Sequence, residues 1–430
     1  MKKITPFLCF VIILASCKQE KVVIADSAFT DSLIANYTLP AAIKANEDEL
    51  QFWLSRIKPQ TPDIVNDARY ASTLAARFTL LGDITDIKKS DSVLKRLDAA
   101  FSHKEASPNV SLLANAIRQH RFKEAETYLE KARTIGIKKY EVFSLGFDVD
   151  FELGRYDQAQ AELRVIRSSD DYGYFFLKSK WEHFKGNMDS AIAAMYKATE
   201  LARSNDWLRL AALSNEADLC IHNGELEKAY ELYQQSVKIN AADYHSITAI
   251  GWIALVHDKN DSLAEKIFQF VHSKIKSPDP LFKLYQMAQG KKDTVLEKRY
   301  ATEFANQAND SLYGNMYNKY LIEIYTGILK DPAKAEAIAK KEIEGRSTPQ
   351  TYAWYAYSLL TNNKKEEAYK VYEQFVSGKP LEGLELYWMG KLMQTFNKGY
   401  NAMEFFKAAH KNRYDLSPAM ADDLENELKE

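Results

Sequence analysis

A repeat of about 35 residues runs through most of this 430-residue chain. Each copy has a turn residue, a short polar stretch and then a small or apolar residue, most clearly at residues 120–125, 154–159 and 224–229. The small or apolar position recurs ten times, at Ile87, Ala125, Ala159, Ala191, Ala229, Ala264, Val295, Ala335, Ala368 and Ala402. The nine intervals between these positions span 315 residues, a mean spacing of 35. Such a period predicts a solenoid, because one unit cannot bury its own apolar face and must stack on its neighbours.

The composition indicates that the repeating unit is helical. The chain has 16 Gly and 11 Pro, well below the usual shares of about 7% and 5%. This shortage of turn residues argues against an all-β chain and favours long helices. The 57 Lys and Arg nearly balance the 59 Asp and Glu. Nothing therefore indicates a nucleic-acid partner.

The period and the residue types resemble the tetratricopeptide repeat, a 34-residue helix–turn–helix unit. The best copy spans residues 349–380, where Ala356 and Ala368 are small enough for two helices to approach closely and Asn363 suits a left-handed turn. The resemblance covers residues 68–414 and is poor at 280–310, where Val295 replaces Ala. It implies an all-α fold, a right-handed α-solenoid of about ten such repeats.

The first 17 residues have the form of an export signal. Two lysines precede an apolar run at residues 7–14, which is too short to span a bilayer. The run leads into Leu14-Ala15-Ser16-Cys17, which resembles the lipobox of bacterial lipoproteins. The resemblance implies cleavage before Cys17 and a diacylglycerol on its thiol. An ordinary secretory signal followed by a chance cysteine is the alternative.

The polar residues 18–21 are similar to the start of lipoproteins from Bacteroidota, and we expect a flexible tether to about Asp26. The expected location is the cell envelope, lipid-anchored to the outer membrane, with the periplasmic and surface faces both open. After processing, Cys220 is the one cysteine left without lipid. It sits between Leu219 and Ile221 in a helical pattern, so we expect a small buried apolar side chain.

The chain is therefore predicted to divide into five segments. They are a signal peptide (1–16), a lipidated cysteine with tether and lead-in (17–44), an N-terminal covering helix and linker (45–67), the solenoid (68–416) and a C-terminal capping helix (417–430). The covering helix is expected over residues 46–57. The capping helix is expected to begin at Ser417-Pro418, a helix N-cap followed by a proline at the first helical position.

The sequence contains none of the catalytic or metal-binding motifs we sought: no HExxH, no Gly-rich phosphate loop, no GxSxG and no CxxC. His183, His222 and His257 fall near the end of the first helix in successive repeats. Packed helices lie about 8–10 Å apart, whereas a shared zinc needs Zn–N distances of about 2.1 Å. We therefore interpret them as helix-end histidines. The expectation is a protein that is not an enzyme and whose only cofactor is the covalent lipid on Cys17.

In tetratricopeptide-repeat proteins the first helix of each pair lines a concave groove that binds partners. Counting from the clearest copies predicts the groove residues Arg118, Lys180, Asp218, Tyr317, Tyr320, Tyr357, Tyr387 and Lys391. The favoured function is a membrane-anchored scaffold that binds other envelope proteins or peptides. A nutrient- or glycan-capturing lipoprotein of the SusD-like kind is the alternative, although such proteins carry large insertions with exposed Trp platforms.

Overall fold

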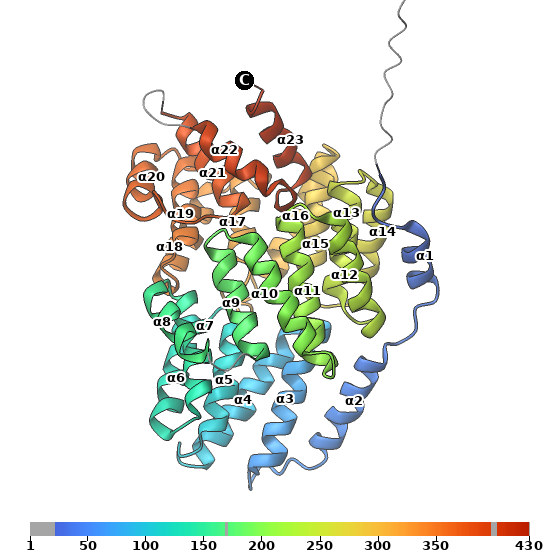
Figure 1. Ribbon diagram of the computed structural model, residues 1–430, viewed down its shortest axis with the longest axis vertical. Helices are drawn as coiled ribbons and strands as arrows, with labels where there is room; N and C mark the ends of the chain where they lie inside the picture. Colours follow the sequence, from blue (N-terminus) through green and yellow to red (C-terminus); the bar gives the residue numbers. More distant parts are fainter. Residues whose placement is uncertain (1–21, 168–170, 397–401, 430) are drawn as a thin grey trace, which may run out of the picture.

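The computed structural model describes residues 22–167, 171–396 and 402–429, so the lipobox and Cys17 lie outside the described residues. Over the described ranges the chain forms 23 α-helices, a π-helical turn and a 3₁₀ turn, and no strand (Figure 1). None of the helices in this part of the chain combines the length and the apolar character that a membrane span requires. The predicted all-α fold is confirmed.

Twenty of these helices form ten consecutive antiparallel pairs (Figure 1). The first helices of the pairs are α3 (Ile64–Leu81), α5 (Ala106–Arg118), α7 (Lys139–Glu152), α9 (Tyr172–Phe184), α11 (Asp206–His222), α13 (Tyr244–Val256), α15 (Asp279–Gly290), α17 (Asn318–Thr326), α19 (Pro349–Thr361) and α21 (Gly383–Gln394). The second helices are α4 (Ile84–Ala100), α6 (Phe122–Ile135), α8 (Tyr156–Ile166), α10 (Met188–Leu201), α12 (Leu226–Ile239), α14 (Asp261–His272), α16 (Thr294–Ala308), α18 (Pro332–Gly345), α20 (Lys365–Val371) and α22 (Ala402–Lys411).

The small repeat position has a constant place in the second helices. In α4, α6, α8, α10, α12, α14, α18 and α20 it is the fourth residue, and in each case its exposed fraction is 0%. The prediction for α16 is wrong: Val295 is 78% exposed, and the fourth residue is the buried Glu297. A search for small or apolar residues could not find the fourth position of α16, because Glu297, which carries a carboxylate, occupies it. Ala402 is the first described residue of α22 and is half-buried.

Left-handed turns close the helix pairs, as predicted. Gly186, Gly224 and Asn363 have φ angles of 77°, 78° and 61°. This conformation is strained for most side chains and is tolerated by Gly and Asn. Helix α20 then continues into a π-helical turn at Tyr372–Val376.

The N-terminal segment contacts the solenoid from Ile24 onward, two residues before the predicted end of the flexible tether at Asp26. The backbone amides of Ile24 and Ala25 donate to the Asp258 carboxylate at 3.0 and 2.8 Å, and both residues are buried. Helix α1 (Ser27–Ala35) follows and contacts α14. Helix α2 (Ala41–Leu54) begins directly after Pro40, five residues before the predicted start, and packs on α3.

The solenoid curls until repeats that are far apart in sequence touch. The amide of Lys276, after α14, donates to the carbonyl of Leu81 at the end of α3 at 2.8 Å. Arg346, after α18, pairs with Glu152 of α7 at 2.8 Å. Helix α23 (Pro418–Glu427), the last in the chain, follows α22 and packs against both α22 and α15 (Figure 1). The concave face of the solenoid therefore becomes the wall of an internal chamber.

Candidate partner-binding chamber

Two adjoining cavities of about 1000 and 1020 Å³ lie on the concave side of the superhelix. The first cavity lies between α7, α9 and the segment from α17 to α21, and the second extends along α11, α13, α15 and α17. Six residues line both cavities, namely His222, Met316, Lys319, Tyr320, Glu382 and Asp415. We refer to the two cavities together as the chamber and to these six residues as its waist.

The structure brings five of the eight predicted groove residues into the chamber. Lys180 lines the first cavity, Arg118, Asp218 and Tyr317 line the second, and Tyr320 lines both. Tyr317 is nevertheless buried, and its hydroxyl donates to Asp279 at 3.1 Å. The tyrosines therefore contribute ring edges to a packed wall and do not form an exposed row.

Tyr357, Tyr387 and Lys391 lie outside the chamber, because their side chains face the next helix along the stack. The Tyr357 ring stacks on Trp388 of α21 with 4.5 Å between centroids. The Tyr387 hydroxyl donates to Asp423 of α23 at 2.7 Å, and Lys391 pairs with Asp423 at 2.5 Å. Helix α23 stacks on α21 as a further first helix would, and it covers this face. The chamber therefore reaches only the start of α21, where Gly383 to Leu386 line it.

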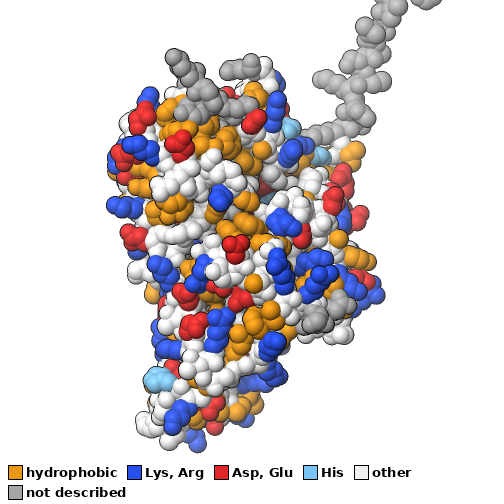
Figure 2. Space-filling view, turned by 60° about the vertical axis from the view of Figure 1, so that its left-hand side comes forward, with side chains coloured by type: hydrophobic (Ala, Val, Ile, Leu, Met, Phe, Trp, Pro, Cys, Tyr) orange, Lys and Arg blue, Asp and Glu red, His pale blue; other side chains and the backbone are white. Residues whose placement is uncertain are grey.

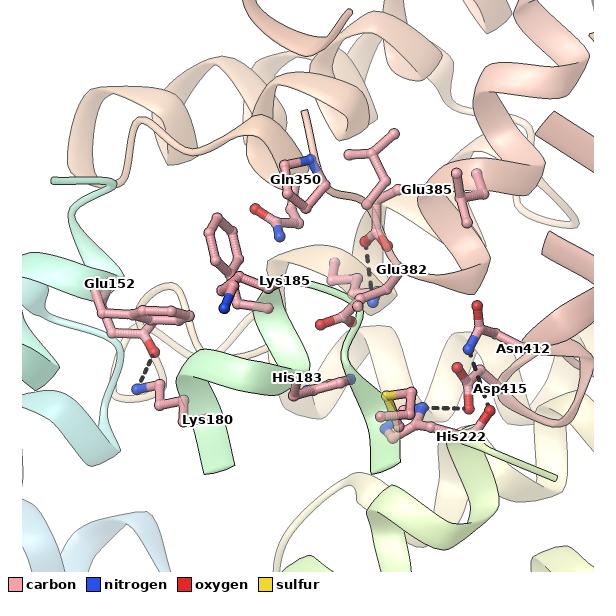
Figure 3. Close-up of a pocket in the computed structure, with 18 of the residues that line it drawn as sticks. Glu152, Lys180, His183, Lys185, His222, Gln350, Glu382, Glu385, Asn412 and Asp415 are labelled. Atoms are coloured by element: carbon pink, nitrogen blue, oxygen red, sulfur yellow. Dashed lines mark hydrogen bonds and ion pairs between the residues drawn. The ribbon is translucent and has the colours of Figure 1, made fainter. Parts of the chain in front are cut away.

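His222 of the waist lies beside His183, which lines the first cavity. The rings of His183 and His222 lie 5.1 Å apart, closer than the spacing of their helices suggests, because the two side chains converge (Figure 3). His222 Nδ1 pairs with Asp415 at 2.7 Å. Burial alone would lower the pKa of His222, but the Asp415 carboxylate raises it to about 9. Burial and the neighbouring His222 charge lower the pKa of His183. Across the described ranges, no three His, Cys, Asp or Glu side chains are arranged to hold a metal ion.

Most charges in the first cavity are already paired. Glu152 accepts Lys180 at 2.9 Å and Arg346 at 2.8 Å (Figure 3). Burial would raise the pKa of Glu152, but the two cations lower it to about 2. Lys319 of α17 pairs with the buried Glu385 of α21 at 3.1 Å. These pairs join different repeats and hold the wall in one arrangement.

The second cavity is richer in aromatic rings, and two of its cations, Lys283 and Arg118, form no salt bridge among the described residues. The Lys283 ammonium lies 3.6 Å from the ring centroid of Trp252, and burial lowers its pKa to about 8. Arg118 donates to Asn115 at 3.3 Å, and no carboxylate in the described part of the chain pairs with it. Burial raises the pKa of Glu323, which lies nearby, to about 7. The cavity thus offers cationic donors beside flat apolar surfaces, a combination suited to a polypeptide segment.

Several wall residues were missed from the sequence. Extending the predicted positions by one helical turn finds some of them: His222 is four residues after Asp218, and Met316 is four before Tyr320. The role of Trp252 and Asp415 had no such signal, because their contacts form only when the superhelix curls.

Cys220 is fully buried, as predicted, and burial raises the pKa of its thiol to about 12.

Stability should depend on pH through His222. Its pKa is higher in the folded chain than in the unfolded chain, so the stabilisation is complete below pH 6.5 and is lost as the pH rises towards 9. We expect a loss of about 3 kcal/mol over this window. Urea unfolding at a series of pH values measures it, and Asp415→Asn should flatten the profile. An equally steep profile in Asp415→Asn would contradict the assignment.

The face of the molecule in Figure 2 carries both signs of charge, with Lys and Arg interspersed among Asp and Glu. The ten helix pairs and the regular small position determine the architecture. The fold is a tetratricopeptide-like α-solenoid.

The sequence matches no protein-family model and no curated protein. Among solved structures, the chain is similar to the Cut9–Hcn1 hetero-tetramer of the APC/C, with 12% identity, a TM-score of 0.49, and 88% of this chain and 69% of that chain covered. It is also similar to yeast Tom70 (11% identity, TM-score 0.43, 90% and 93% covered). A third similar structure is a tetratricopeptide repeat protein from Parabacteroides merdae (14% identity, TM-score 0.34, 60% and 97% covered). These likenesses carry no information on partners.

Proposed function

We propose that this protein is a lipid-anchored scaffold of the bacterial cell envelope that binds a polypeptide segment of a partner protein in its chamber. The observation that carries the proposal is the chamber itself. Pockets for small ligands have volumes of about 300–1000 Å³, and each of the two cavities has a volume at the upper end of this range. Its wall alternates charged groups with aromatic rings, which suits a chain with both polar main-chain and apolar side-chain groups.

A short tether supports anchoring close to the membrane. Six residues separate Cys17 from Ile24, the first residue held by Asp258. Six extended residues reach about 20 Å. A lipid on Cys17 would therefore hold the turn between α13 and α14 near the bilayer, and the lipobox points to the outer membrane as its location.

One observation favours glycan capture as a second candidate. Trp207 lines the second cavity and is 54% exposed, so it presents a flat aromatic face to solvent. An exposed ring of this kind can stack on an apolar ligand face. Trp207 is a single exposed ring, however, and a neutral sugar has no negative charge to pair with the cationic groups nearby. We therefore prefer a polypeptide.

Arg118→Ala tests the scaffold proposal, and Arg164→Ala is its matched control. Arg118 faces the chamber, whereas Arg164 is exposed on α8 and donates to Gln160 of the same helix. A hydrogen bond to a charged group contributes about 1.5–3 kcal/mol, so Arg118→Ala should reduce partner recovery from solubilised envelopes about tenfold or more. Quantitative mass spectrometry after affinity purification measures this.

The control should recover partners as the wild type does, and both variants should melt within a few degrees of it. Equal recovery by Arg118→Ala and wild type would place binding elsewhere. Thermal stabilisation by soluble oligosaccharides that disappears in Trp207→Ala would favour glycan capture instead.

A further inference from the structure

A short segment near the C-terminus crosses the concave face, and we call residues 412–418 the C-terminal latch. It includes the 3₁₀ turn Arg413–Asp415 and ends at the start of α23. The Asn412 amide donates to the His222 carbonyl at 3.2 Å, and Asp415 pairs with the His222 ring at 2.7 Å. Figure 3 shows both side chains pointing at His222 from the opposite wall. The partners are about 190 residues apart in sequence.

The latch continues over the next two first helices. On α13, the Trp252 indole N–H donates to the main-chain carbonyl of Tyr414 at 2.7 Å. On α15, the Ser417 hydroxyl donates to Gln289 at 2.7 Å, and Gly290 leaves room for Pro418, since a Cβ there would lie 2.8 Å from the proline ring. Three successive first helices thus bind one segment. They contact the carboxylate of Asp415, the main-chain carbonyl of Tyr414 and the hydroxyl of Ser417.

These contacts differ in kind from those that stack the repeats. Neighbouring repeats join helix to helix, whereas the latch is a turn and an extended stretch that inserts between walls. Leu416 and Ser417 are each 1% exposed and residues 412–415 are half-buried, as expected of a peptide that lies in a groove. Asn412 lines the first cavity, Tyr414 the second, and Asp415 both. The latch therefore forms part of the partition between the cavities.

We infer that the concave face of α11, α13 and α15 is a binding site for a short acidic peptide segment, and that the chain's own residues 412–418 occupy it until a partner segment of the same chemistry replaces them. The inference rests on the proposed scaffold function and names the class of partner. The partner segment has an Asp or Glu that pairs with His222. The residue before this acid has a free main-chain carbonyl that accepts from Trp252, and a Ser or Thr two residues after the acid donates to Gln289.

The latch competes as part of the same molecule, at an effective concentration of the order of millimolar. A free peptide should therefore bind the wild-type chain weakly and gain affinity when the latch is weakened. The probe is a fluorescein-labelled peptide with the sequence of residues 409–420, titrated into the purified full chain and followed by fluorescence anisotropy. Asp415→Asn in the protein removes the acid from the latch and leaves His222, Trp252 and Gln289 in place.

We expect Asp415→Asn to bind this probe at least tenfold more tightly than wild type. A probe with Asn at the position of Asp415 should lose that gain, and so should the double variant Asp415→Asn/Trp252→Phe. Equal binding of both probes, or no binding of either to Asp415→Asn while its melting temperature stays near that of wild type, would overturn the inference.

A disulfide provides a second, independent variant. A Cβ built on Gly383 lies 3.1 Å from the Asn412 Cβ, a few tenths of an ångström below the 3.5–4.5 Å range of disulfides. When oxidised, the double variant Gly383→Cys/Asn412→Cys should hold the latch in place and should not bind the probe. Reduction of the disulfide should restore probe binding. Tight probe binding to the oxidised form would contradict the inference.

The two proposals can fail separately. If the oxidised lock recovers envelope partners as the wild type does, the latch proposal is wrong and the scaffold proposal stands. If the probe behaves as expected but no chamber variant changes the recovery of any partner, the peptide site stands and the scaffold proposal is wrong.

Discussion

Lys319→Met is expected to destabilise the chain by about 3–5 kcal/mol, the cost of leaving a buried charge without its partner. Glu385 is fully buried and accepts from Lys319 at 3.1 Å and from the Trp354 indole at 2.7 Å. Burial would lower the pKa of Lys319, but the neighbouring Glu385 raises it, so the ammonium group stays charged in the folded chain. Methionine retains the apolar stem and removes only the ammonium group. The remaining indole N–H cannot balance a full negative charge.

The control is Lys180→Met, which also breaks a pair in the chamber wall. Its partner Glu152 keeps a second cation, Arg346 at 2.8 Å, so the loss should be clearly smaller. The double variant Lys319→Met/Glu385→Gln should recover most of the stability, because it removes both charges. Urea unfolding gives the ranking, and hydrogen exchange of α17 to α21 shows whether the damage stays local, as expected of a solenoid. Equal losses in both single variants would mean that Arg346 does not compensate Glu152.

Cys17→Ser is expected to move the protein from the membrane to the soluble fraction, or to leave it unprocessed. The lipobox resemblance assigns the acyl chains to this sulfur, and a serine hydroxyl cannot replace the thiol in that reaction. Anchoring by several chains is stable, whereas one chain alone is marginal, so the change in partition should be nearly complete. Fractionation and mass spectrometry of the mature N-terminus are the measurements.

Cys9→Ser is the matched control, because Cys9 lies in the apolar run of the signal and would be removed with it. This variant should remain on the membrane. An unmodified mature N-terminus in the wild type, or cleavage at another residue, would exclude lipidation.

The local rules of the helix pair were readable from the sequence alone. Ala125, Ala229 and Ala368 are fully buried where two helices meet, and Gly224 and Asn363 adopt the left-handed turns that their residue types suit. Each of these features depends on neighbours within about one repeat. The period of 35 residues predicted a solenoid of about ten repeats, and the scarcity of Gly and Pro together with the resemblance to the tetratricopeptide repeat predicted that it is all-α. The same resemblance led to Arg118, Asp218 and Tyr320, which line the second cavity.

The tertiary structure decided what the concave side contains. A small change in rotation per repeat accumulates over ten repeats, so the contacts of Leu81 with Lys276 and of Trp252 with Tyr414 have no signal in the local pattern. The face predicted at Tyr387 and Lys391 is covered by α23, which stacks on α21 one repeat further along the chain. Helix pairing is set by short-range periodicity, whereas the closure of the superhelix depends on the sum of all repeat angles. Only the folded chain shows that its own residues 412–418 cross the groove.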